Sequence, residues 1–352
     1  MSRSIRAAGL RTPARDRIGV IGTAVAVLVA VAMASSGPPS ATAQSDDPAL
    51  TPLTVGLGFI PSVQFAQFYL AEEAGYYDEA GLDVTFQNKI DPELITLVAQ
   101  GAIDIGMADG TSVIPAVSQR IPIAYGATVY GRFPGVVYAL DESGIADAAG
   151  LAGKRIGIPG RFGSSWIMLQ ALLASAGLDQ SDVEIVSYPD FGQAVALAQG
   201  QVDAATGFAN NEPVQLALQG LDVVVLDIDS VAPLPGPGLV VGPSILAAEP
   251  EAAQAFAAAT LRAMEEITRD PQLGLDATFA RVPELGADPE TQAAILDATI
   301  GIWQSDHAIA NGLGSIDLDA WRSAVEIMTS LPDSVVAGPV AVADLVTDAL
   351  LP

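Results

Sequence analysis

Short apolar runs alternate with amphipathic segments along most of the chain, and the alternation is clearest between residues 53 and 87. Residues 53–57 are β-branched and apolar and end in the turn Gly58-Phe59-Ile60-Pro61. An amphipathic segment follows, stopped by Gly75, and residues 82–86 are a second apolar run. This order predicts a strand, a helix and a strand, the unit of parallel sheets covered by helices. Ligands of such sheets bind beyond the carboxyl ends of the strands, so the turn at 58–61 is the first candidate site.

The same pattern continues to about residue 246, after which the chain becomes mostly helical. Further strands are expected at 103–108, 121–129, 136–140, 155–158, 183–187, 202–206, 223–226 and 239–246. Helices are expected between them, beginning near residues 91, 110, 166, 191 and 210, and later at 249–268, 289–304 and 317–330. We read the runs at 121–140 and the Pro- and Gly-rich segment at 233–238 as two crossings between lobes. The late helices are expected to pack on the first lobe.

Four segments, in this order, carry a resemblance to a known family. They are the turn and helix that end in Ala-Glu-Glu-Ala-Gly-Tyr-Tyr at 71–77, Gln-Gly-Ala-Ile-Asp-Ile-Gly at 100–106, Leu-Ala-Gly-Lys-Arg-Ile-Gly-Ile-Pro-Gly at 151–160, and Ala-Gln-Gly-Gln-Val-Asp-Ala-Ala at 198–205. The chain is similar, over about residues 53–247, to solute-binding proteins of ABC importers. More narrowly, it resembles the branch that binds nitrate, sulfonates, taurine and thiamine-precursor pyrimidines.

The resemblance implies an α/β, two-lobed periplasmic-binding-protein fold of type II-like organisation. Each lobe would be a mainly parallel sheet covered by helices, with the ligand cleft between the lobes and closure about the crossing strands. We expect a signal peptide and linker at 1–43, the first part of lobe 1 at 44–137, lobe 2 at 138–237, and the second part of lobe 1 at 238–352. The expected partners are a small-molecule solute and ABC permease subunits.

The first 43 residues have the features of an export signal. Five arginines precede the apolar run at 18–34, and a Pro-, Ser- and Ala-rich stretch ends in Ala41-Thr42-Ala43. This predicts a secretory signal cleaved before Gln44 and a place in the periplasm or on the outer face of the membrane. An uncleaved anchor is the alternative, since 17 apolar residues are at the short limit for a span.

The charge and the cysteine count narrow the function classes. The chain has 41 acidic and 15 basic residues, a net charge of −26, and this balance argues against nucleic acid and anionic membranes as partners. It contains no Cys, which excludes a lipid-modified cysteine, disulfides and thiolate metal sites. We predict a monomer without cofactor or metal.

Candidate ligand-binding residues in the first lobe follow its strands. Phe59, Pro61 and Gln64 belong to the first turn and the helix after it. Phe59 is suited either to stacking on a flat ring or to closing the core. Asp109 follows the expected strand at 103–108, where its carboxylate would accept hydrogen bonds from a ligand or cap the next helix.

The second lobe offers a larger set. Gly163, Ser164 and Ser165 stand at an expected helix start, whose N–H groups favour a carbonyl, carboxylate or phosphate; N-capping by one serine is the alternative. Trp166 is suited to lining the cleft or to packing between helix and sheet. The remaining candidates follow the strands at 183–187 and 202–206, and the resemblance implies that the Asn/Glu segment among them faces the cleft: Tyr188, Asn210, Asn211 and Glu212.

The ligand class follows from the balance of cations and rings. A sulfonate or nitrate site needs cations or dense N–H donation, and only Arg132 and Arg161 stand near the expected cleft. Aromatic residues near the turns are more numerous: Phe59, Tyr130, Phe133, Phe162, Trp166, Tyr188 and Phe208. We therefore favour a thiamine-precursor pyrimidine or a related vitamin-like ring such as a flavin, with sulfonate, taurine or nitrate as the alternative.

An enzyme and a receptor module are the rival classes. Pyrimidine synthases share the fold, and their resemblance implies chemistry that depends on His and Cys. This chain has no Cys and a single His, His307, far in sequence from every strand end, so we predict no enzymatic activity. A ligand-sensing module would need a signalling or transmembrane segment after the binding lobes.

Overall fold

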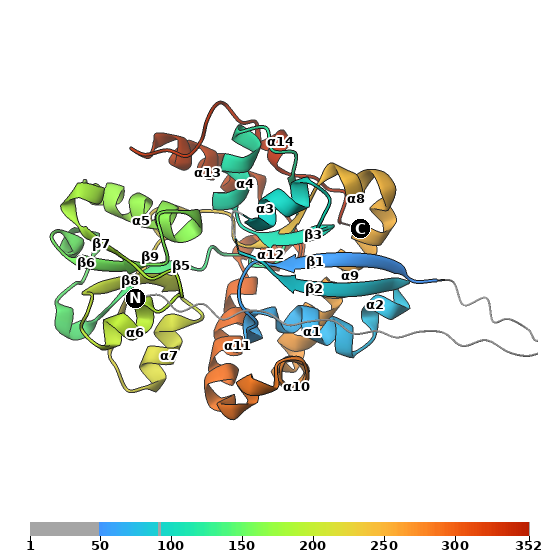
Figure 1. The fold of residues 1–352 in the computed structure, drawn as a ribbon, viewed down its shortest axis with the longest axis horizontal. Helices are drawn as coiled ribbons and strands as arrows, with labels where there is room; N and C mark the ends of the chain where they lie inside the picture. The colour runs from blue at the N-terminus through green and yellow to red at the C-terminus, as the bar shows by residue number, and fades with distance from the viewer. Residues whose placement is uncertain (1–48, 91–92, 352) are drawn as a thin grey trace, which may run out of the picture. The chain divides into compact units, whose positions relative to one another are not determined.

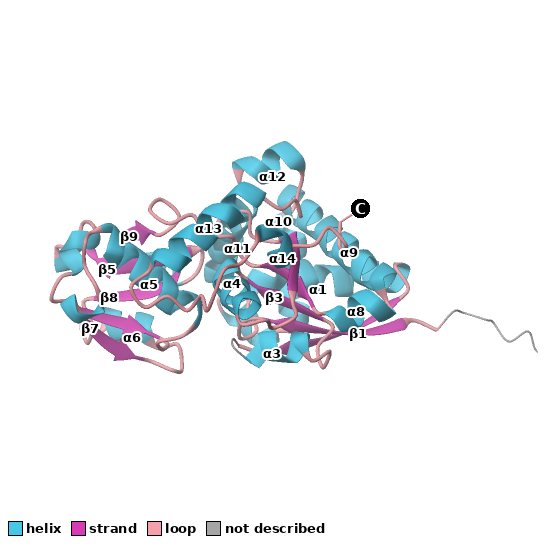
Figure 2. Cartoon of the chain, turned by 90° about the horizontal axis from the view of Figure 1, so that it is seen from above, coloured by secondary structure: helices cyan, strands magenta, loops and turns pink. Residues whose placement is uncertain are grey.

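A computed structural model describes residues 49–90 and 93–351. The described residues belong to one compact unit that contains two five-stranded sheets flanked by helices (Figures 1 and 2). The expected signal at 1–43 and the helix start expected at Asp91 and Pro92 lie outside the described residues.

The first sheet has the strand order β2-β1-β3-β10-β4. Its strands are β1 (Thr51–Leu57), β2 (Leu82–Asn88), β3 (Ile105–Ala108), β4 (Ala124–Thr128) and β10 (Gly238–Val241). β1 pairs in parallel with β2 and β3, whereas β10 runs antiparallel between β3 and β4.

The second sheet repeats this plan with the order β7-β6-β8-β5-β9. Its strands are β5 (Gly135–Leu140), β6 (Arg155–Ile158), β7 (Glu184–Ser187), β8 (Ala204–Phe208) and β9 (Val223–Asp227). β6 is parallel to β7 and β8, and β5 is antiparallel to β8 and β9. In each sheet the antiparallel strand is the one whose chain arrives from the other sheet. The predicted fold class of two mainly parallel sheets covered by helices is confirmed.

The repeated Gln-Gly-x-x-Asp motifs have the same structural role in the two sheets. The Asp104 carboxylate accepts a hydrogen bond of 2.8 Å from the backbone N–H of Thr54. The Asp203 carboxylate accepts one of 2.9 Å from the backbone N–H of Arg155, whose guanidinium also pairs with it at 2.8 Å. Each aspartate thus ties the start of one parallel strand to its neighbour, and the arginine lowers the pKa of Asp203.

The helices between strands cover the two sheets (Figure 1). They are η1 (Val63–Phe65), α1 (Ala66–Glu73), α2 (Tyr76–Glu79), α3 (Glu93–Ala99), α4 (Gly110–Ser118), α5 (Gly163–Ser175), α6 (Gln193–Ala198) and α7 (Glu212–Leu218). Short 3-10 turns lie at η2 (Asp141–Ser143), η3 (Ala148–Leu151) and η4 (Gln180–Asp182). In residues 49–90 and 93–351, none of the helices combines the length and hydrophobicity that a membrane span requires.

The helices after β10 contact both sheets' helices. They are α8 (Pro243–Ala248), α9 (Pro250–Arg269), α10 (Pro271–Arg281), η5 (Pro283–Ala287), α11 (Pro289–Trp303), α12 (Asp306–Asn311), α13 (Leu318–Ser330) and α14 (Val342–Leu345). α9 and α10 pack on α1, and α9 also packs on α2, where the rings of Tyr77 and Phe256 stack with centroids 5.0 Å apart. However, α11 also contacts α7, and α13 contacts α5, so the late helices pack on helices of the second sheet as well as on the first lobe.

Several boundaries differ from the sequence-based expectation by a few residues. The return strand expected at 239–246 ends at Val241, because Gly242 is extended and Pro243 starts helix α8 at the first helical position, which suits its fixed φ. Helix α5 begins at Gly163 rather than at Trp166. The expected lobe boundary after residue 137 falls within β5.

Two connecting segments, residues 129–134 and 228–237, run between the sheets and are hydrogen-bonded to each other. The backbone N–H of Tyr130 donates to the carbonyl of Pro237 at 2.8 Å, so the outgoing and returning chains run together. A Cβ at Gly236 would lie 2.3 Å from the Tyr130 carbonyl oxygen, so this approach requires glycine.

Candidate ligand pocket

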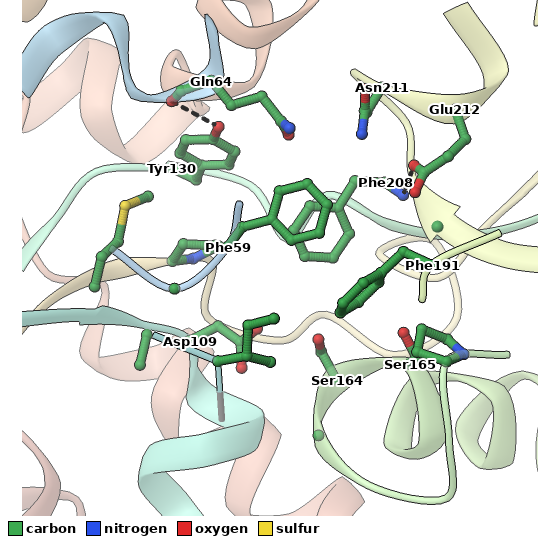
Figure 3. A pocket seen from close by; sticks show the side chains of 18 of the residues that line it. Phe59, Gln64, Asp109, Tyr130, Ser164, Ser165, Phe191, Phe208, Asn211 and Glu212 are labelled. Carbon is green, nitrogen blue, oxygen red and sulfur yellow. Dashed lines mark hydrogen bonds between the residues drawn. The ribbon is translucent and has the colours of Figure 1, made fainter. Parts of the chain in front are cut away.

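A pocket lies where the carboxyl ends of strands from both sheets meet (Figure 3). Its walls come from the segments after β1, β3, β6, β7 and β8 and from the two connecting segments. The empty volume of the pocket is about 1020 Å³ when its open mouth is included. The volume that the centre of a water molecule can occupy is smaller, about 150 Å³. The segments that the strand-end rule singled out therefore lie at this pocket.

The segment after β1 is held by hydrogen bonds within the first sheet's side. Asn88 Nδ2 donates to the Phe59 carbonyl at 2.6 Å, and a Cβ at Gly58 would lie 2.7 Å from the Met107 carbonyl oxygen. Ser62 caps η1 by accepting from the Gln64 backbone N–H at 3.2 Å. The sequence thus fixes Phe59 at the pocket through a tight glycine turn and a capped helix.

Gln64 lines the pocket at the centre of a polar network. Asn210 Nδ2 donates to Gln64 Oε1 at 3.1 Å and to Thr299 Oγ1 at 2.8 Å, and Tyr130 Oη donates to the Gln64 carbonyl at 3.3 Å. Burial of the ring raises the pKa of Tyr130, so the hydroxyl stays a donor. Asn210 is fully buried and does not line the pocket; it joins α11 to the segments after β1 and β8.

Asp109 lines the pocket and is also the N-cap of α4. Its carboxylate accepts from the backbone N–H of Thr111 at 2.9 Å and from the Thr111 hydroxyl. Both roles considered from the sequence are therefore compatible with its position.

The start of α5 faces the pocket without a side-chain cap. Phe162 holds the N-cap position and makes no capping hydrogen bond, so the alternative that one serine caps this helix does not hold. Gly163, with a positive φ of 60°, lets Ser164 and Ser165 occupy the first turn, and all three line the pocket. The first-turn N–H groups and the two hydroxyls are suited to a ligand carbonyl.

Asn211 and Glu212 line the pocket at the start of α7. The Glu212 carboxylate accepts from the Phe208 backbone N–H at 2.9 Å, and burial raises the pKa of Glu212. Asn211 Oδ1 accepts from Gln215 Nε2 at 2.7 Å. The Asn211 side-chain nitrogen Nδ2 is then the atom that faces the pocket (Figure 3).

Two pocket residues after β7 were not predicted. Phe191 and Gln193 line the pocket, whereas Tyr188, the residue named from this loop, does not. The rings of Phe191 and Phe59 meet edge to face, with centroids 5.2 Å apart. Phe191 has a φ of 61°, a left-handed conformation that sequence rules do not assign to Phe, and it turns the loop toward the pocket.

Several other predicted residues lie outside the pocket lining. Pro61 is exposed, Trp166 is buried under the Arg161 guanidinium at 4.9 Å, and Tyr188 packs against a small core cluster under the second sheet. His307 lies on α12, near Asp317, away from the lining. Within the described ranges, no cluster of three or more His, Asp or Glu side chains is arranged to hold a metal.

The described lining is rich in rings and carries acids but no cation. Tyr130, Phe162 and Phe208, noted from the sequence as aromatics near turns, line it together with Phe59, Phe65 and Phe191. Asp109 and Glu212 are its carboxylic acids, and none of its described residues is Lys, Arg or His. Arg132 is exposed and donates to the Gly301 carbonyl at 3.0 Å.

Comparison with solved structures places the fold among ABC solute-binding proteins. The alkanesulfonate-binding protein SsuA from Xanthomonas axonopodis pv. citri, bound to MOPS, superposes with a TM-score of 0.63 at 17% identity, over 82% of this chain and 95% of that one. At the level of sequence, the chain belongs to the NMT1/THI5-like family, whose model matches residues 62–273.

Two curated relatives differ in how much of the chain they match. The riboflavin-binding protein RibY of Chloroflexus aurantiacus is 31% identical over 347 residues, which cover 96% of this chain and 98% of RibY. The 4-amino-5-hydroxymethyl-2-methylpyrimidine phosphate synthase of Aspergillus parasiticus is 29% identical over 239 residues, which cover 63% of this chain and 68% of the synthase.

Proposed function

We propose that this protein is an exported solute-binding protein of an ABC importer that captures a flat, uncharged heteroaromatic solute and delivers it to a permease. Riboflavin is the first candidate, and a thiamine-precursor pyrimidine is the second. The observation that carries this proposal is a ring-walled pocket whose described lining contains two carboxylic acids and no cation.

The aromatic wall suits a planar ring. Phe59, Phe191 and Phe208 lie around the middle of the pocket, between polar groups on either side (Figure 3). Aromatic side chains stack on or meet the edges of planar ligands and add about 0.5–1.5 kcal/mol per contact beyond area burial. The full-length similarity to a riboflavin-binding protein supports a flavin.

The charge of the lining disfavours the sulfonate, taurine and nitrate alternative. Anionic groups are bound in proteins by Arg, Lys or dense N–H donation. Here the α5 start is the main donor group, and Asp109 lies in the same lining. One helix start can bind a ring carbonyl, but the neighbouring carboxylate would oppose a full negative charge.

Binding without chemistry is the remaining part of the proposal. The sequence contains no Cys, and His307, its single His, lies outside the pocket. The similarity to a pyrimidine phosphate synthase covers less of the chain than the similarity to RibY. Neither a nucleophile nor a general base with a positioned partner is present among the described lining residues.

A binding panel tests the proposal directly. Riboflavin, 4-amino-5-hydroxymethyl-2-methylpyrimidine, taurine, an alkanesulfonate and nitrate are each titrated against the purified protein by calorimetry and thermal shift. A specific ligand at 100 times its Kd should add about 2.7 kcal/mol to the unfolding free energy. Binding of riboflavin or the pyrimidine alone is expected. Stabilisation by taurine, the sulfonate or nitrate alone would overturn the proposal.

A further inference from the structure

Gln193 is a buried pocket residue with one unpaired polar atom. It is the first residue of α6, is 1% exposed and lines the pocket. Its Nε2 donates to the Thr206 carbonyl at 3.1 Å, whereas its Oε1 is shielded from water and has no hydrogen-bond partner among the described residues. Because the amide nitrogen must face the carbonyl, the remaining atom is an acceptor.

Gln193 Oε1 differs from the other unpaired side-chain atoms because its residue lines the pocket. Side-chain atoms without a partner also occur in the described part of the chain at Gln67, Tyr138, Gln170, Asn210 and Trp303, but none of those residues lines the pocket. Buried acceptors are nearly always paired in folded proteins, so an orphan atom at a binding pocket points to a donor that the ligand brings.

The surrounding backbone holds Gln193 in place. Gly157 on β6 has no Cβ, and one built there would lie 3.1 Å from Gln193 Cβ, so the glycine admits this close packing. The Thr206 carbonyl on β8 fixes the amide. The left-handed Phe191, two residues earlier, brings a ring and the amide of one loop to the same pocket. Strain of this kind is concentrated at functional sites.

We propose that Gln193 is a specificity-determining residue whose Oε1 accepts a hydrogen bond from a ring N–H of the solute. The inference rests on the proposed function and sharpens it: the preferred ring carries an unsubstituted imide or amino N–H. Because Oε1 is shielded from water here, the ring must displace pocket side chains to reach it. Phe191, whose ring meets that of Phe59, belongs to the same loop as Gln193.

The test compares riboflavin with its N3-methyl derivative, which lacks the imide N–H. Both are titrated by flavin fluorescence against the wild-type protein, Gln193→Met and the matched control Gln170→Met. Gln170 is also a buried glutamine with an unpaired amide, but it lies on α5 outside the pocket lining. Leaving a buried acceptor unpaired should cost about tenfold or more in affinity.

The expected pattern is a loss of about tenfold on N-methylation in the wild-type protein and in Gln170→Met. In Gln193→Met, riboflavin should bind about tenfold more weakly, and N-methylation should change affinity less than about threefold. An equal penalty for N-methylation in all three proteins would overturn the role of Gln193, while riboflavin binding by the wild type would leave the proposed function intact.

Two further outcomes are distinguishable. If the wild type binds the aminopyrimidine instead, the same comparison is made with its N-methylated amino group. If it binds neither ring, both the proposed function and the role of Gln193 fail. Should Gln193→Met not fold, Gln193→Asn stays an amide but withdraws the acceptor by one methylene group, and it is expected to weaken the preference for the N–H ligand; an unchanged preference in Gln193→Asn would overturn the inference.

Discussion

The two sheets have the same strand arrangement, but the polar groups at their strand ends differ in their hydrogen bonding. On the first sheet's side, Asn88 holds the Phe59 loop, Ser62 caps η1 and Asp109 caps α4. On the second sheet's side, the start of α5 has no side-chain cap and Gln193 Oε1 has no partner among the described residues. On the first side these polar groups are used in hydrogen bonds within the protein, whereas the second side has the groups that we propose bind the solute.

This difference shows how one topology can provide both support and recognition. The repeated Asp104 and Asp203 contacts keep both sheets in register, so the strand ends are equally well positioned. The two sides differ in whether the polar groups compared above form hydrogen bonds within the protein. Substitutions on the first side should then act on stability or on ring packing, and substitutions of the groups left open on the second side, Gln193 and Ser164, should act on ligand selection.

The largest expected effect is on the ring wall. Phe59→Ala removes the ring that meets Phe191 and should weaken riboflavin binding by about tenfold to a hundredfold. The loss should be equal for riboflavin and its N3-methyl derivative, since the wall does not read the N–H. Calorimetry measures both. Ile60→Ala, at the exposed neighbouring residue outside the lining, is the control. Unchanged riboflavin affinity in Phe59→Ala would contradict the proposed contact between the Phe59 ring and the solute.

The cap on the first side should be needed for stability. Asp109→Ala removes the N-cap of α4 and should lower the free energy of unfolding by about 1–2 kcal/mol. Asp109→Asn keeps an acceptor for the Thr111 N–H and should cost far less, because Asn is also a favoured cap. Urea unfolding measures both variants. If the two variants were equally destabilised, the carboxylate charge rather than the cap would be responsible.

Glu212, which is partly buried, should make stability depend on pH. Because burial raises its pKa above the ordinary 4.5, the folded protein keeps this proton when the unfolded chain has released it. The contribution is fully present below pH 4.5 and is lost as pH rises toward the raised pKa, by about 1.4 kcal/mol per pKa unit.

Glu212→Gln isolates this effect, since Gln keeps an acceptor for the Phe208 N–H and does not ionise. Relative to the wild type, the variant should gain stability as pH rises from 4.5 to 8 and show no such gain at lower pH. Thermal unfolding across this range measures the difference. A difference that is flat with pH would show that Glu212 ionises normally in the folded protein.

The smallest expected effect separates binding from stability on the second side. Ser164→Ala removes a first-turn hydroxyl that caps nothing, so the free energy of unfolding should change by less than about 0.5 kcal/mol. Riboflavin affinity should fall about fivefold if the hydroxyl donates to a ring carbonyl. Ser175→Ala, at the other end of α5, is the control for loss of a serine from the same helix. Unchanged affinity in Ser164→Ala would remove this serine from the site.

Sequence reasoning located the pocket segments better than the pocket side chains. The alternation of runs and the Gly and Pro turns predicted the strands, and the strand-end rule then pointed to Phe59, Gln64, Asp109, Gly163, Ser164, Ser165, Asn211 and Glu212, all of which line the pocket. The same rule chose Tyr188 rather than Phe191 and Gln193. In that loop Phe191 has a left-handed φ of 61°, which no local pattern predicts, and the side chains of Phe191 and Gln193 line the pocket.

The sequence by itself determined the strand and helix order, the family and the segments at the strand ends, because hydrophobic periodicity and turn residues act locally. The tertiary structure alone decided that Asn210 is a buried link between Gln64 and Thr299, that Trp166 packs under Arg161, and that Gln193 keeps an unpaired oxygen at the pocket. These outcomes depend on contacts between residues far apart in the chain, which the two connecting segments bring together and which no local pattern encodes.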